Sequence, residues 1–306
     1  MKLHNDEHDC NDLHTTPAFG EKPHTHMRQQ LDAIQVRLIA PPSEEQFREI
    51  VSVFMQNTWN NQIDFDVDNA NSSAIIRDLF LGKILPTGME TINLTWSVEG
   101  LDLIDTTHLI RHRLFSFSAQ THADRDMRFD RVMVKPGIMV NSEFYDRYTK
   151  ICRDAKRLYC DMMDSGEINC LDARTIMPRC FEHFYIVRGT IKDIVAFCIM
   201  RADEQIQTQS DNIVALKLWL EILKQYPFLG GLINFRKPDA FYVKQSAEGK
   251  TNIFPPNEKN DLFDWAPKQF FHDKHRDEFP GGSYYITLRD KLLDEIDAFK
   301  PIGLFK

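Results

Sequence analysis

Arg111, His112 and Arg113 form the most compact group of side chains in the sequence that are able to bind or polarise a ligand. Asp105 is expected to cap a helix that runs through Phe115 and carries this triplet. Consecutive side chains on a helix point about 100 degrees apart. The triplet is therefore predicted to contact different parts of a ligand, or different ligands. A basic patch on a solvated helix face is the plain alternative.

Two more arginines lie in later segments that are predicted to be helical. Arg174 follows Asp172, and Arg201 precedes Asp203. A guanidinium group suits a phosphate or carbonyl group, since it forms planar, paired hydrogen bonds. An ion pair with the neighbouring acid is the ordinary explanation for each arginine. Gln205 stands four residues after Arg201, so both side chains would share one helix face.

The segment RHRLFSFSAQT, residues 111–121, resembles the signature of the flavin-dependent thymidylate synthases, in which RHR is followed by seven residues and a serine. Thr121 stands at the serine position, and Ser116 also matches. Three further segments agree in the expected order: the strand and helix at 35–56, GMET at 88–91, and LDARTIMP at 171–178 followed by IMRAD at 199–203. The resemblance covers roughly residues 35–225.

The resemblance implies a site for flavin adenine dinucleotide (FAD). In the family the RHR triplet contacts the flavin, and its first arginine also lies near the nucleotide. The resemblance therefore implies these contacts for Arg111, His112 and Arg113. Thr91, from the matching E-T pair, joins them. Lys192 stands where the family often has a flavin-contacting arginine, so it keeps the charge and loses the planar fork. Gln205 stands where the family usually has a histidine. The expected cofactor-binding set is Thr91, Arg111, His112, Arg113, Lys192 and Gln205.

The resemblance also implies a pyrimidine nucleotide site. Arg201 is expected against the N3 and O2 edge of the base, where a fixed positive charge stabilises the ionised ring in a site closed to water. Arg201 and Thr121 are the expected catalytic residues, and no metal site is expected. The expected substrate-binding set is His108, Arg111, Gln120, Thr121, Arg125, Arg174 and Arg201.

The sequence departs from the family pattern within the signature itself. Ser118 and Ala119 replace an asparagine and a glutamate, and Ala123 replaces an arginine. Arg125 or Arg128 is the available replacement for the missing phosphate charge. Such clustered change in one segment indicates an altered substrate or an altered chemistry.

The implied activity is C5 methylation of a uracil nucleotide, of the dUMP to dTMP type, with methylenetetrahydrofolate as donor and NADPH restoring the flavin. No cysteine lies near the motif, which fits polarisation of the base by Arg201 in place of a cysteine nucleophile. The resemblance implies a homotetramer with shared active sites. Two alternatives stay open: C5 methylation or hydroxymethylation of UMP or dCMP, and a nucleotide- or flavin-binding protein without catalysis.

The elements that must position these residues indicate an α+β fold, an antiparallel-type sheet packed with long helices. Apolar and polar residues alternate over 92–99, as in a strand with one buried face. A capping box at Ser43 and Gln46 predicts the first helix. Further helices are predicted from Ser142 toward Gly166, from Thr190, and after Thr287. The expected divisions are a flexible tail at 1–33, a catalytic domain at 34–227 and an extension at 228–306.

Composition narrows the functional classes. The chain has 306 residues and a formal net charge of −8, which argues against binding a nucleic-acid polymer. No stretch of eighteen apolar residues is present, and the first thirty residues lack the apolar stretch of a secretory signal. We therefore expect a cytoplasmic protein, or a virus-encoded one made in host cytoplasm, with no membrane partner.

Overall fold

The computed structural model of the chain describes residues 27–66, 68–119, 127, 130–202, 208–236 and 281–305. A four-stranded sheet in the order β2-β3-β6-β4 forms its centre, and every neighbouring pair is antiparallel. These strands are β2 (Gln35–Ile39), β3 (Asn93–Leu101), β4 (Ser116–Ala119) and β6 (His183–Thr190). The expected α+β class with an antiparallel sheet is confirmed. A second, two-stranded sheet pairs β1 (Met27–Gln29) in parallel with β5 (Val132–Val134).

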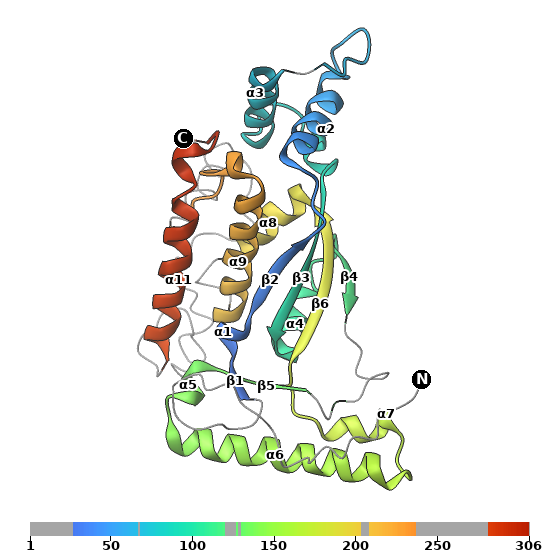
Figure 1. Ribbon diagram of the computed structural model, residues 1–306, viewed down its shortest axis with the longest axis vertical. Helices are drawn as coiled ribbons and strands as arrows, with labels where there is room; N and C mark the ends of the chain where they lie inside the picture. Colours follow the sequence, from blue (N-terminus) through green and yellow to red (C-terminus); the bar gives the residue numbers. More distant parts are fainter. Residues whose placement is uncertain are drawn as a thin grey trace, which may run out of the picture.

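Helices pack on one face of the central sheet and extend beyond its two ends (Figure 1). Beside the sheet lie α8 (Ile191–Arg201), α9 (Gln209–Gln225) and α11 (Gly282–Asp297), with α4 (Leu103–Leu109) following β3. At one end are α2 (Glu44–Gln56), α3 (Asn69–Phe80) and the 3-10 helix η1 (Pro86–Glu90). At the other are α5 (Pro136–Met139), α6 (Ser142–Ser165) and α7 (Cys170–Ala173). The short elements are α1 (Gln30–Ala33), η3 (Arg174–Ile176), η4 (Pro227–Leu229) and η7 (Lys300–Ile302).

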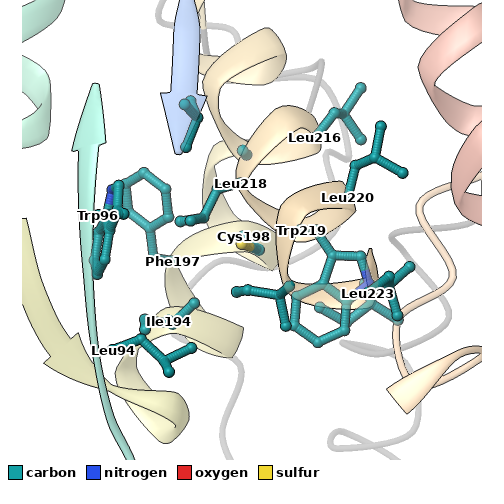
Figure 2. Packing of buried hydrophobic residues seen from close by; sticks show 14 of the residues in the cluster. Leu94, Trp96, Ile194, Phe197, Cys198, Leu216, Leu218, Trp219, Leu220 and Leu223 are labelled. Atoms are coloured by element: carbon teal, nitrogen blue, oxygen red, sulfur yellow. The ribbon is translucent and has the colours of Figure 1, made fainter. Parts of the chain in front are cut away.

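The period-two pattern of β3 places one row of its side chains in the main hydrophobic core. Leu94, Trp96 and Val98 are fully buried, whereas Asn93 and Glu99 are exposed. Helices α8 and α9 supply the facing side of this core, and Figure 2 shows their apolar side chains beside Leu94 and Trp96. Because α9 lies between the sheet and α11, it is buried on nearly all sides. This layer fixes the ends of α8 and α9.

Several predicted helix boundaries agree with the structure. Ser43 and Gln46 form the expected capping box of α2. Thr190 caps α8, and α6 ends at Gly166, which has the left-handed backbone typical of a glycine after a helix. The last helix starts at Gly282, earlier than expected from Thr287.

The last residues of the predicted tail, 27–33, form β1 and α1 in the structure. Met27, Gln29 and Gln30 are buried within β1 and α1, because β1 pairs with β5 from the middle of the chain. The segment expected to be an extension also contributes to the main core, through Tyr285 and Leu293 of α11. The division of the chain into domains at residues 34 and 227 stays a prediction.

Candidate active site

The RHR triplet lies in a turn that follows α4. The backbone N–H of Arg111 bonds to the carbonyl of His108 at 3.3 Å, and that of His112 bonds to Leu109 at 3.2 Å. The helix predicted to carry the triplet is therefore wrong at both ends. The observed helix, α4, starts after Asp102, whose side chain accepts a hydrogen bond from the Asp105 N–H at 2.9 Å, and it ends at Leu109. The chain leaves the helix because Ser116 must pair with Arg188 to begin β4.

Phe115 anchors this turn in the core. Its ring stacks on the imidazole of His112 at 5.6 Å and meets Trp96 edge-on at 5.1 Å. Phe197 of α8 contacts both Phe115 and His112. Phe115 and Phe197 thus fix the orientation of the His112 ring, and Trp96 supports Phe115 from behind.

Gly189 on β6 provides the space for the Phe115 ring. A Cβ atom there would lie 2.4 Å from Cδ1 of Phe115. We expect Gly189→Ala to shift that ring and to lower the free energy of unfolding by about 1–3 kcal/mol, the usual cost of overpacking a core. Urea unfolding measures the change. In a Phe115→Leu background the same substitution should cost clearly less; an equal cost would show that Phe115 is not the side chain displaced.

Arg201, the last residue of α8, lies directly behind the RHR turn. Its Nε donates to Nε2 of His112 at 2.8 Å, and its Nη2 donates to the carbonyl oxygen of His108 at 2.9 Å. Nη1 lies 3.4 Å from Oδ2 of Asp211. Arg201 is 8% exposed, so its guanidinium is a buried cation that His112, the His108 carbonyl and Asp211 help to hold. The structure thus brings together three expected site residues: His108, His112 and Arg201.

The electrostatics of the two histidines differ. Burial, with the charge of Arg201, lowers the pKa of His112 to about 4, so the ring is neutral and its Nε2 accepts from Arg201. The hydrogen bond to Asp211, at 3.0 Å, raises the pKa of His108. Burial, partly offset by Asp211, lowers the pKa of Arg201, and Arg111 lowers it further. Arg111 is thus close enough to act on Arg201 electrostatically.

The neutral state of His112 predicts a pH effect on stability. An ordinary histidine titrates near 6.5, whereas His112 titrates near 4 when folded. Between these values the unfolded chain binds more protons, so stability is lost as the pH falls. We expect the wild type to lose on the order of 1 kcal/mol more than His112→Gln between pH 7 and pH 5, after allowing for solvent screening.

Urea unfolding of the two proteins at both pH values measures this difference. Glutamine keeps a neutral acceptor for Arg201 but does not titrate. The opposite contribution of His108, whose raised pKa favours the folded state at low pH, is common to both proteins and cancels. Equal losses in the two proteins would contradict a depressed His112 pKa.

Asp211 was not among the residues singled out from the sequence. The acid expected beside Arg201 was Asp203, which lies outside the described residues. Asp211 sits in the first turn of α9, where Thr208 caps its N–H, and its side chain is 7% exposed. The sequence around Asp211 shows only an ordinary helix start, with the capping Thr208 three residues before it, and the burial of the carboxylate appears only in the folded chain.

A second polar cluster ties α4 to α9. Lys135 Nζ donates to Asp105 Oδ2 at 2.9 Å and to Ser210 Oγ at 3.0 Å, and it lies 3.2 Å from Asp102. Gln30 also donates to Asp105. Burial raises the pKa of Asp105 to about 6 despite Lys135. These contacts hold the helix starts that precede His108 and Asp211, so they fix the cluster around Arg201.

Two expected flavin contacts lie at the opposite end of α8. Lys192 Nζ bonds to Glu90 at 2.6 Å, which places it beside Thr91 at the end of η1. Thr91 itself donates to the carbonyl of Gly88 at 2.7 Å. Nine residues of helix, about 14 Å at 1.5 Å per residue, separate Lys192 from Arg201. A ligand that contacts both must be elongated.

Arg174 does not join the cluster within one chain. It starts η3 after α7, at the end of the molecule occupied by α6, whereas α8 lies beside the sheet (Figure 1). Its expected neighbour Asp172 accepts a hydrogen bond from Asn169. Gln120, Thr121, Arg125 and Gln205 lie outside the described residues, so their roles stay predictions. Arg111 and Arg113 are exposed at the turn.

Comparison with known proteins identifies the family of the chain. The family described as thymidylate synthase complementing protein, Thy1, matches residues 28–228. The chain belongs to this family. A flavin-dependent thymidylate synthase of Thermococcus onnurineus is 28% identical over 156 residues, which are 48% of this chain and 62% of that relative. One of Nitratidesulfovibrio vulgaris is 27% identical over 188 residues, 56% of this chain and 74% of the relative.

A solved structure shows that this Thy1 chain shares its fold with another protein. The UMP/dUMP methylase PolB from Streptomyces cacaoi, bound with 5-Br dUMP, has a TM-score of 0.52 and 16% sequence identity. The likeness covers 71% of this chain and 97% of PolB. The chain therefore contains nearly the whole PolB fold together with segments outside it. Among the described helices, none is long and apolar enough to cross a membrane.

Proposed function

We propose that the chain is a flavin-dependent enzyme that methylates C5 of a uracil nucleotide, with dUMP as first substrate. The observation that carries this proposal is that His108 and His112 converge on the buried guanidinium of Arg201. Arg111 is close enough to lower the pKa of that guanidinium. The family and the names of its members support the same activity. Methylenetetrahydrofolate and NADPH are the proposed co-substrates.

The donor set fits FAD. Arg111 and Arg113 are exposed at the turn, and Lys192 with Thr91 lies about 14 Å along α8. Cations and hydroxyls spread over such a length suit a dinucleotide that carries a pyrophosphate and a flat ring. These four residues would hold the cofactor, with His112 behind the ring. When bound, the flavin supplies the redox step of methyl transfer.

The chain's own residues would bind and polarise the pyrimidine. Arg201 presents a rigid positive charge, because His112, the His108 carbonyl and Asp211 fix its orientation before substrate arrives. A preorganised charge stabilises negative charge that develops on the base without reorganising during the reaction. The neutral His112 accepts from Arg201, so it adds no competing positive charge beside the base. Thr121 would act next to the nucleotide as a hydroxyl donor.

A shared site in a homotetramer would bring Arg174 to the cluster. Arg174 lies away from Arg201 within one chain, so another copy must supply it if it binds the same nucleotide. Helix α6 carries an exposed apolar stripe: Phe144, Ile151 and Leu158 are 56%, 65% and 42% exposed. These positions are seven residues apart, close to two helical turns, so they lie along one side. Such a stripe on a long helix supports packing between copies.

UMP is the second candidate substrate. The solved protein PolB acts on both UMP and dUMP by its name. Ser118, Ala119 and Ala123 depart from the family pattern in the segment expected to read base and sugar. Both facts favour UMP, which carries ribose, as a candidate substrate in addition to dUMP, which carries deoxyribose.

Flavin binding tests the proposal. Purified protein is expected to be yellow, with FAD absorption that elutes with the protein at the size of a tetramer, and dUMP should perturb that spectrum. A colourless protein that takes up no added FAD would contradict the proposed function.

A further inference from the structure

Helix α11 reaches the candidate site from outside the region that matches the family. The matched region ends at residue 228, and α11 begins at Gly282. Even so, α11 packs against α9, and Tyr285 in its first turn is completely buried. A buried tyrosine hydroxyl requires a hydrogen-bond partner.

Asn212 on α9 is such a partner. The hydroxyl of Tyr285 donates to Oδ1 of Asn212 at 2.8 Å, and Nδ2 of Asn212 donates to the carbonyl oxygen of Arg201 at 2.6 Å. A carbonyl oxygen only accepts, so the Asn212 amide must turn its NH2 group toward Arg201 and its oxygen toward Tyr285. Asn212 is 1% exposed, so water does not replace either contact.

These bonds act on the end of α8. The last carbonyl groups of a helix have no partner within it, and Arg201 is the last residue of α8. Asn212 satisfies its carbonyl, while the preceding Asp211 contacts its guanidinium. The first turn of α9 thus holds both the backbone and the side chain of Arg201.

We propose that Tyr285 and Asn212 are positioning residues for Arg201, so that the C-terminal helix α11 is part of the nucleotide-binding apparatus. This inference rests on the proposed function, because Arg201 is the residue assigned to the pyrimidine. Loss of the Tyr285 hydroxyl removes the hydrogen bond from α11 to the buried Asn212 amide, and this loosens the end of α8.

The test compares Tyr285→Phe with Tyr284→Phe in the full-length, FAD-loaded protein. Tyr284 is the neighbouring tyrosine on α11, and its hydroxyl bonds to Asp32, away from Asn212. We expect Tyr285→Phe to weaken dUMP binding by about five- to tenfold, the effect of a lost buried hydrogen bond. FAD content should stay at the wild-type level, and Tyr284→Phe should bind dUMP as the wild type does. Calorimetric titration with dUMP measures the affinities.

A third variant separates positioning from general stability. In an Arg201→Lys background, Tyr285→Phe should weaken dUMP binding little further, because Tyr285 acts through Arg201. An equal loss in both backgrounds, or wild-type affinity in Tyr285→Phe, would overturn the inference alone. A wild-type protein that binds neither FAD nor dUMP would overturn the proposed function and the inference with it.

Discussion

Replacing Arg201 by alanine is expected to abolish methylated product while leaving FAD bound. Arg201 is the buried cation assigned to the pyrimidine edge, whereas the residues proposed to hold FAD, which are Arg111, Arg113, Lys192 and Thr91, are unchanged in this variant. Loss of a preorganised charge that stabilises developing negative charge costs at least about a hundredfold in rate. Product measured per bound FAD reports the chemical step separately from cofactor loss.

Two further variants control this experiment. Arg201→Lys keeps a positive charge but lacks the planar fork that binds His112 and the His108 carbonyl, so it should retain part of the activity. Arg37→Ala removes an exposed arginine of β2 and should behave as the wild type. Wild-type turnover in Arg201→Ala would overturn the assigned role.

Mixed tetramers of two inactive variants are expected to regain activity. Arg174→Ala and Arg201→Ala each remove one side of every site when expressed alone. If each site takes Arg174 from one copy and Arg201 from another, random co-assembly leaves about a quarter of the sites complete, because both copies must carry the intact residue. Co-expression with two different affinity tags yields the mixed species, and product formation is measured against the wild type.

The control for this mixture combines both substitutions in one chain. Tetramers mixed from wild type and the Arg174→Ala/Arg201→Ala double variant report any effect of assembly itself. Mixed tetramers of the two single variants that stay as inactive as either parent would contradict a site shared between copies. Monomeric wild-type protein with full activity would contradict it as well.

The strands and the long helices were predictable because their signals are local. The alternation of Leu94, Trp96 and Val98 identifies β3, and a cap identifies the start of α2 and of α8. The RHR segment misled the same approach, because Leu109, Ile110, Leu114 and Phe115 were read as the apolar positions of one helix, whereas Ile110 and Leu114 are exposed and only Leu109 and Phe115 are buried. They reach the core from opposite ends of a turn, set by the pairing of β4 with β6 and by the space at Gly189.

The residues that hold Arg201 and His108 in place could not be predicted, because each contacts a residue that is distant along the chain. His108 and Asp211 are 103 residues apart, and Tyr285 lies 73 residues beyond Asn212. Neither pair leaves a local pattern, because each acid or amide also looks like an ordinary residue of a first helical turn. Arg201 was assigned to the pyrimidine through the family resemblance alone, and its contacts with His112, His108 and Asp211 emerged only from the fold.

The chain is proposed to transfer a one-carbon unit to C5 of a uracil nucleotide. The most direct measurement incubates the reduced, FAD-loaded protein with methylenetetrahydrofolate and, separately, dUMP, UMP and dCMP, and weighs the nucleotide products by mass spectrometry. We expect a methylated uracil nucleotide, formed first from dUMP, and no such product with Arg201→Ala. Unchanged nucleotides from the FAD-loaded wild type in all three reactions would contradict it.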